Sequence, residues 1–183
     1  IEIMRKYWSG ERFDYNGTIF QLEDVDMLPL PYQPGGPDLW VCGRSDPAMR
    51  RAARLGDGWQ PYMYTAEQFH DSVGKVKDFA AEAGRELSDD FAFTSFIYVS
   101  MHEDVETARN NAIEQMTFRF NLPAEKIVDR YCAYGPDQRI IENLESYVKA
   151  GANKLIVALI MPPEERMDYV ERFAVNILPE LQK

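Results

Sequence analysis

The 183-residue sequence predicts an α/β fold built on a parallel sheet. Two observations carry this prediction: short apolar segments alternate with longer segments of helical periodicity, and turn residues separate the two kinds. Nearly continuous apolar runs in such an alternation are typical of strands in a parallel sheet with helices outside it. Four strand–helix units of this kind are half of an eight-stranded (β/α) barrel, and they also suit a small open doubly wound sheet.

The composition is that of an ordinary globular protein with an acidic balance. Hydrophobic residues make up 45% and charged residues 27%, and 30 acidic against 20 basic residues give a formal net charge of −10. The length fits one domain, residues 1–183. Because contacts to nucleic acids and anionic membranes need clustered Lys and Arg, the charge argues against both partners, although a local basic spot can still bind one phosphate.

The cysteines and histidines are few. Cys42 and Cys132 are too few for a disulfide framework, so we expect reduced thiols in a cytoplasmic protein. Together with two histidines they provide no metal-ligand spacing, and no metal is expected. The longest apolar run, residues 155–161, is strand length and well short of the roughly 20 residues of a membrane span.

Residues 1–37 precede the regular alternation. The first eight residues read as the last turns of a helix that Gly10 ends, so the chain looks like a piece of something longer. Arg12–Phe20 predicts a small hairpin, because Asn16-Gly17 favours a type I′ turn. Residues 28–37 contain four prolines and two glycines and predict a loop.

Residues 38–183 carry the four strand–helix units. In the second helix, Phe69, Val73, Val76 and Ala80 recur at spacings of three and four. Cys132 and Tyr134 are expected in a loop, after which Pro136 starts a helix. The expected strands are Leu39–Cys42, Gly58–Met63, Phe91–Met101 and Lys154–Ile160. The expected helices are Asp46–Leu55, Thr65–Ala83, Glu103–Phe120, Ala124–Tyr131, one from Pro136 to Gly151 (with Ile140, Ile141, Leu144 and Val148 inward), and Pro163–Leu181.

The turn after the first of these strands has the chemistry of an anion site. Gly43, Arg44 and Ser45 offer free backbone N–H groups, a cation and a hydroxyl at a helix N-terminus, as a phosphate requires. A purely structural interpretation stays open, with Ser45 or Asp46 as N-cap and Pro47 at the first helical position. Asp46 also opposes an anion unless its carboxylate points away or Arg44 offsets it.

Several short motifs follow one another along the chain in a fixed order. They are Asn16-Gly17, Pro29-Leu30-Pro31-Tyr32-Gln33, Leu39–Cys42, Gly43-Arg44-Ser45, Arg50-Arg51-Ala52-Ala53 and Asp57-Gly58-Trp59. A weaker match includes Ala150-Gly151-Ala152-Asn153, before the final strand. In this order and spacing the motifs resemble the luciferase-like flavin monooxygenase family, which includes relatives that use a deazaflavin.

The resemblance implies a fold, a cofactor and its site. The fold is the C-terminal half of a TIM (β/α)8 barrel, strands five to eight, and the cofactor is FMN or, as the alternative, a deazaflavin. Its phosphate is expected at Cys42, Gly43, Arg44 and Ser45, although the family usually has glycine where Cys42 stands, and Pro47 removes one N–H donor. Trp59 either lines the pocket below the flavin ring or is a core tryptophan.

The implied function is that of a flavin-dependent monooxygenase or oxidoreductase acting on a small organic substrate, with this chain carrying the phosphate-binding half. The family's catalytic acid–base residues come from the other half, so no catalytic residue is assigned. His102, beside Glu103 and Asp104, is typical of a helix start, and its place after the strand Phe91–Met101 leaves contact with a ligand as the alternative.

Three other functions stay open: deazaflavin-dependent hydride transfer, a non-catalytic phosphate- or flavin-binding half-barrel, and an unrelated open α/β protein that binds a nucleotide. Half a barrel also leaves two strand edges unpaired. We therefore expect a homodimer, or pairing with the missing half of the barrel.

Overall fold

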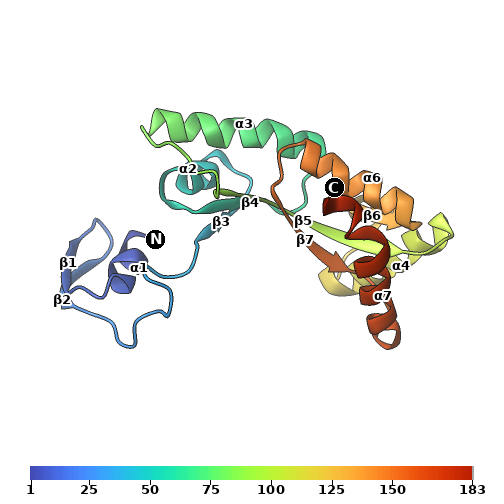
Figure 1. Cartoon of the computed structure of the whole chain (residues 1–183), viewed down its shortest axis with the longest axis horizontal. Helices are drawn as coiled ribbons and strands as arrows, with labels where there is room; N and C mark the ends of the chain where they lie inside the picture. Colours follow the sequence, from blue (N-terminus) through green and yellow to red (C-terminus); the bar gives the residue numbers. More distant parts are fainter. Residues whose placement is uncertain (183) are drawn as a thin grey trace.

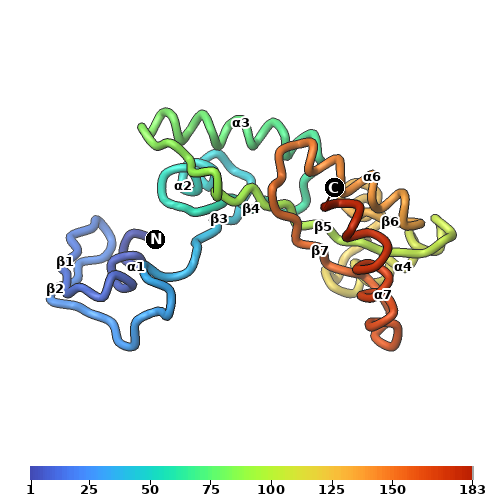
Figure 2. The backbone as a smooth tube through the Cα atoms, viewed as in Figure 1, coloured from blue at the N-terminus to red at the C-terminus, as the bar shows by residue number. Residues whose placement is uncertain are grey.

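The computed structural model describes residues 1–182 and contains two sheets. An antiparallel hairpin of β1 (Phe13–Asn16) and β2 (Gln21–Val25) lies beside helix α1 (Glu2–Trp8) at one end of the molecule (Figure 1). Figure 2 shows the chain leaving this hairpin through residues 26–39 to enter the second sheet, which is parallel. The strands of that sheet are β3 (Trp40–Cys42), β4 (Gly58–Gln60), β5 (Ala92–Met101), β6 (Cys132–Gly135) and β7 (Lys154–Leu159).

Helices alternate with these strands, as the sequence pattern predicts. They are α2 (Asp46–Leu55), α3 (Ala66–Glu82), α4 (Val105–Phe120), α5 (Glu125–Tyr131), α6 (Asp137–Lys149) and α7 (Arg166–Arg172). The expected closing helix is interrupted: 3-10 turns (Pro163–Glu165 and Glu180–Gln182) and a π-helical segment (Phe173–Ile177) flank α7. In α6 the buried residue of the last turn is Tyr147, whereas the expected Val148 is exposed. Among residues 1–182, no helix has the length and apolar character needed to cross a bilayer.

Strand β5 is the centre of the parallel sheet and has partners on both edges. Strand N–H groups point alternately to the two edges, so Ala92 and His102, ten residues apart, donate on the same side. Ala92 donates to the Asp57 carbonyl of the β4 segment (2.9 Å) and His102 to the Gly135 carbonyl of β6 (3.0 Å). β4 and β6 therefore follow each other along one edge, and β7 pairs with residues 94–99 along the other.

The two faces of this sheet are covered by different helices. On the outer face, defined by Trp59, Ile97 and Val157, α2, α3, α6 and the C-terminal helical segments form the larger apolar core. On the inner face, which carries Tyr98 and Ala158, α4 and α5 form a smaller core. The expectation of helices outside the sheet is thus confirmed for most of them, whereas α4 and α5 cover the inner face near the carboxyl end of β5.

The hairpin forms, but the predicted type I′ turn at Asn16-Gly17 is wrong. Asn16 pairs with Gln21, and a four-residue loop closes through a hydrogen bond from the Gly17 N–H to the Phe20 carbonyl (2.9 Å). Gly17 does not adopt the positive φ that this turn requires. A Cβ there would lie 2.5 Å from the Tyr15 ring, so glycine provides space rather than backbone freedom.

Strand β6 occupies residues that the sequence pattern assigns to a loop. Its four residues, Cys132–Gly135, lie directly between α5 and Pro136, too short a run for a periodic signal. They become a strand because β5 extends past the end of β4 and offers its edge at residues 98–101. The sheet thus has five parallel strands where four were predicted.

Asp57 connects the N-terminal helix to the sheet. Arg5 of α1 donates to its carboxylate (2.7 Å) and to the Leu55 carbonyl (3.1 Å). The same carboxylate accepts the Leu39 N–H (2.8 Å) just before β3. The aspartate of the Asp-Gly-Trp motif therefore joins three segments of the chain at the amino end of the sheet.

Gly58 of the same motif is required by space. A Cβ at this position would lie 2.6 Å from Ala92 Cβ, 2.8 Å from the Ala92 carbonyl oxygen and 2.9 Å from Trp40 Cδ1. The Trp40 ring and β5 therefore approach the β4 backbone more closely than any side chain at position 58 would permit.

We predict that Gly58→Ala destabilises the fold by about 1–3 kcal/mol, because the added methyl group would overlap Ala92 and the Trp40 ring. Gly74→Ala is the matched control: Gly74 lies within α3 with no heavy atom within 4 Å of an added Cβ. This control is expected to stabilise the protein by about 0.5–1 kcal/mol. Urea unfolding of both variants measures the difference, and equal midpoints would contradict the spatial argument.

The edges of the parallel sheet lead to a second prediction. Among the described strands, β3 pairs with β4 alone and β7 with β5 alone, so each presents a free edge. Ile19, Leu28 and Tyr32 near the hairpin are also exposed. We propose that a second copy covers these surfaces, and light scattering during size-exclusion chromatography should give at least twice 21.2 kDa. A single sharp peak at the monomer mass would sink this proposal.

Candidate functional site

The predicted anion-binding turn leaves the sheet at the carboxyl end of β3. Gly43 has a φ of +133° and donates its N–H to the Gln60 carbonyl at the end of β4 (3.2 Å). The expectation of a free N–H at Gly43 is therefore wrong, because the neighbouring strand already accepts it. A Cβ there would lie 2.8 Å from Ala48 Cβ, so both conformation and space favour glycine. The turn carries the chain directly to the N-terminus of α2.

Ser45 and Asp46 bear on the choice between helix capping and anion binding. Ser45 is the N-cap of α2, yet its side chain makes no capping hydrogen bond. The Asp46 carboxylate lies 3.6 Å from Lys75 Nζ on α3, so this negative charge is directed toward the neighbouring helix. The Ser45 hydroxyl therefore makes no hydrogen bond to the helix. The Asp46 carboxylate points away from the turn, as binding of a phosphate there requires.

Arg44 provides the cation of the turn. Its guanidinium donates to the Met63 carbonyl (3.1 Å) and lies 5.8 Å from the centre of the Tyr64 ring, whose hydroxyl donates to the Arg44 carbonyl (3.2 Å). Throughout residues 1–182, no carboxylate lies within ion-pair distance of Arg44. The loop after β4 thus holds an exposed, uncompensated positive charge beside the start of α2.

Backbone donors complete the turn. Within the described part of the chain, no group accepts the N–H of Arg44, Ser45 or Asp46, and Pro47 has none to offer. Unpaired N–H groups at a helix N-terminus favour negative charge through the helix dipole. Three amides, one hydroxyl and one guanidinium are a donor set that fits a phosphate group.

Cys42 and Trp59 lie on different sides of the sheet. Cys42 is an exposed free thiol at the end of β3. Trp59 is 0% exposed and stacks on Phe69 of α3, with its ring pointing away from the inner face. Its indole N–H donates to the Gly43 carbonyl (2.9 Å). Of the five predicted residues, Gly43, Arg44 and Ser45 form the turn and Cys42 directly precedes it. Trp59 is a core tryptophan that contacts the turn through its hydrogen bond to Gly43.

A pair of tyrosines on the inner face was not singled out from the sequence. Their hydroxyls lie 2.7 Å apart, Tyr62 just beyond β4 and Tyr98 on β5. Burial, reinforced by this hydrogen bond, raises the pKa of Tyr62 well above its ordinary value. Phe96, Tyr98 and Ser100 alternate on one face of β5, and that alternation was the available signal.

A cavity of about 270 Å³ opens beside this pair, where β5 and β7 end. The guanidinium of Arg119, on α4, lies 5.6 Å from the centre of the Tyr98 ring at its wall. The lining residues are Tyr98, Gln115, Met116, Phe118, Arg119, Ala158, Leu159, Ile160 and Met161.

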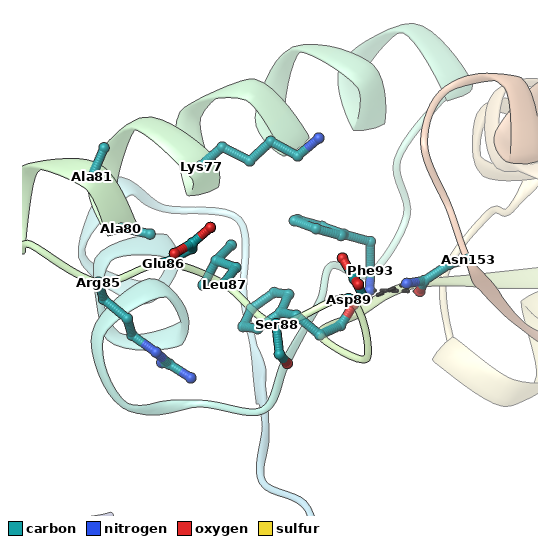
Figure 3. A pocket seen from close by; sticks show the side chains of 11 residues that line it. Lys77, Ala80, Ala81, Arg85, Glu86, Leu87, Ser88, Asp89, Phe93 and Asn153 are labelled. Atoms are coloured by element: carbon teal, nitrogen blue, oxygen red, sulfur yellow. Dashed lines mark hydrogen bonds between the residues drawn. The ribbon is translucent and has the colours of Figure 1, made fainter.

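A larger cavity, of about 430 Å³, lies at the opposite end of the sheet (Figure 3). Asn153 lines this cavity, and its side chain accepts the Phe93 N–H and donates to the Phe91 carbonyl, both at 2.9 Å. Arg85 at its edge donates to the carbonyls of Ala53 and Gly56, where α2 ends. Parallel α/β proteins form their ligand sites at the carboxyl ends of strands, whereas this cavity lies at the amino ends. We therefore do not consider it a candidate ligand site.

His102 lies where the chain leaves β5 for α4. Its Nδ1 accepts the Asp104 N–H (3.0 Å), and Asp104 in turn caps α4 by accepting the Thr107 N–H. Hydrogen bonds to Thr107 lower the pKa of the Asp104 carboxyl. Over residues 1–182, no group of three His, Cys, Asp or Glu side chains is arranged to hold a metal ion.

Two comparisons show what the fold is. The chain superposes on the F420-dependent tetrahydromethanopterin reductase from Methanopyrus kandleri with a TM-score of 0.79 at 17% identity, covering 97% of this chain and 60% of that one. A monooxygenase from Streptomyces bottropensis gives 0.77 at 21% identity, covering 98% and 59%. These are TIM-barrel proteins, and the chain corresponds to about half of the barrel.

Curated relatives match the whole chain in sequence. The F420-dependent glucose-6-phosphate dehydrogenases of Mycobacterium tuberculosis and Nocardia farcinica are each 24% identical over 100% of this chain. The match spans 59% of the length of each relative. The family model for luciferase-like monooxygenases matches residues 1–126. That range includes the hairpin, the turn at Gly43-Arg44-Ser45 and the tyrosine pair, and the chain belongs to the luciferase-like monooxygenase family.

Proposed function

We propose that this chain binds the phosphate of a flavin or deazaflavin at Gly43-Arg44-Ser45 and belongs to an oxidoreductase of small organic substrates. FMN is the first candidate cofactor. A deazaflavin used for hydride transfer is the second candidate, and it is supported by the names of the F420-dependent relatives.

The observation that carries the proposal is the arrangement of charge and donors around Ser45. The hydroxyl is free of capping, Arg44 has no acidic partner among residues 1–182, and Asp46 is directed toward Lys75. Each charge-assisted hydrogen bond to a phosphate contributes roughly 1.5–3 kcal/mol. A site of three or more such donors is sufficient to anchor the charged end of a cofactor.

The cofactor supplies the redox chemistry when bound, and the protein supplies orientation and exclusion of water. Gly43 permits close approach of the phosphate, and the Trp59 hydrogen bond to its carbonyl fixes the turn. From there the inner face leads toward Tyr62 and Tyr98, which hydrogen-bond to each other. A molecule anchored at the turn would therefore extend over the carboxyl ends of the strands.

We predict that Arg44→Glu weakens FMN binding by at least about tenfold, because one charge-assisted contact is lost and a repulsive charge is added. Quenching of flavin fluorescence during titration measures the affinity, and F420 is titrated in parallel to choose between the cofactors. Arg51→Glu makes the same charge change at an exposed position on α2 and is the matched control.

Unchanged affinity in Arg44→Glu, or equal losses in both variants, would refute the turn as the anchor. Failure of the unaltered chain to quench either cofactor would favour a scaffold or a module that binds another phosphate.

A chemical labelling experiment tests the same site independently. At pH 8, iodoacetamide should alkylate exposed Cys42 and spare Cys132, because burial raises the pKa of the Cys132 thiol to about 12. Saturating FMN should slow alkylation of Cys42, which directly precedes the turn. Mass spectrometry follows both sites, and protein unfolded in urea serves as the control in which both react. Identical Cys42 rates with and without cofactor would count against the proposal.

A further inference from the structure

Arg119 is the cation on the wall of the inner-face cavity. It lies in the last turn of α4, and its guanidinium is 5.6 Å from the centre of the Tyr98 ring. In the part of the chain that the structure describes, no carboxylate lies within 4.0 Å of it. Its charge also acts on the hydroxyl pair, where it opposes the rise in the Tyr62 pKa. Arg119 is thus a cation without an acidic partner beside a cavity.

The platform under Arg119 is rigid. Tyr98 is 5% exposed, its hydroxyl is held by Tyr62 at 2.7 Å, and its ring packs edge-on against Phe96 with centroids 5.2 Å apart. A guanidinium over an aromatic face keeps the N–H groups at its edges available for other acceptors. Those N–H groups form a planar fork that matches a carboxylate or phosphate in two-pronged hydrogen bonds.

Most of the other residues that line the cavity have apolar side chains. Met116 from α4 and Ala158 and Ile160 from the β7 segment line it, and Gln115 is a further polar lining residue. One cation beside apolar side chains in a cavity of about 270 Å³ suits a small molecule with an apolar body and a single anionic group. Because the chain carries a net charge of −10, such an anion is attracted only where a local cation offsets the overall repulsion.

We propose that this cavity binds the anionic group of a small organic acid, with Arg119 as the specificity-determining residue. The inference rests on the proposed function, in which the same face of the sheet carries the cofactor. Arg44 donates to the carbonyl of Met63, the residue that follows Tyr62. One short loop therefore joins the phosphate turn to the tyrosine pair, and places the acid site beside the cofactor site.

The test uses benzoate and benzamide, which have nearly the same shape and differ in charge. Isothermal titration of the unaltered chain should show benzoate binding at least about tenfold more tightly than benzamide. Arg119→Gln should abolish this preference, and Arg119→Lys should keep part of it because the charge remains. Arg130→Gln is the matched control: its guanidinium lies 5.4 Å from the Tyr131 ring, outside this cavity.

Equal affinity for the two probes, no binding of benzoate, or an unchanged preference in Arg119→Gln would overturn the acid site. Thermal unfolding identifies a variant that fails to fold. If Arg119→Gln does not fold, the test uses Arg119→Lys, which should show a reduced preference for benzoate over benzamide; an unchanged preference would contradict the acid site. Titration of the unaltered chain with FMN and with F420 separates the two proposals. A benzoate preference that depends on Arg119, without binding of either FMN or F420, supports the acid site and contradicts the proposed function. Binding of either cofactor without a benzoate preference supports the proposed function and contradicts the acid site.

Discussion

Pairing along β5 is the interaction on which the parallel sheet depends. Three strands, β4, β6 and β7, form hydrogen bonds to this ten-residue strand, two of them in succession along one edge. Its side chains alternate between two cores, with Ile97 and Val99 on the outer side and Tyr98 on the inner side. Because nearly every residue of β5 is buried, the strand fixes the positions of the helices on both faces.

The same alternation places the candidate chemistry. Side chains on the outer side of β3, β4 and β5 enter the larger core, as Trp59 does, whereas Tyr98 on the inner side of β5 enters the smaller one. Tyr98 is held there by Tyr62 from the neighbouring segment. The carboxyl edge of the sheet thus gathers polar groups from several strands, which is where α/β proteins form their ligand sites.

Electrostatics distinguishes this edge from the rest of an acidic surface. Most of the ion pairs among residues 1–182 join exposed groups and contribute little, such as Arg12 with Asp24 and Asp26. Arg44 and Arg119 are instead held by carbonyl and aromatic groups. Because the net charge is −10, most of the surface repels an anionic ligand, and attraction is expected only close to a cation such as Arg44 or Arg119. The comparisons establish family membership and the half-barrel fold, and the cofactor site at this edge is our proposal.

The sequence by itself determined the features that depend on neighbouring residues. The start of α2 follows from Pro47 in its first turn, and the buried face of α3 follows from periodicity. The loop at 28–37 follows from proline and glycine content. The motif order also identified the family, which the comparisons confirm. These predictions succeed because a helix or a turn is stabilised mainly within a few residues.

Tertiary structure decided what depends on residues far apart in the chain. β6 exists because β5 leaves an open edge, and the hydrogen bond between Tyr62 and Tyr98 joins residues 36 positions apart. The direction of the Asp46 carboxylate depends on Lys75 in another helix. Strand pairing, side-chain direction and local charge balance depend on the packing of segments far apart in the sequence. A local sequence pattern does not encode which distant segment packs against it.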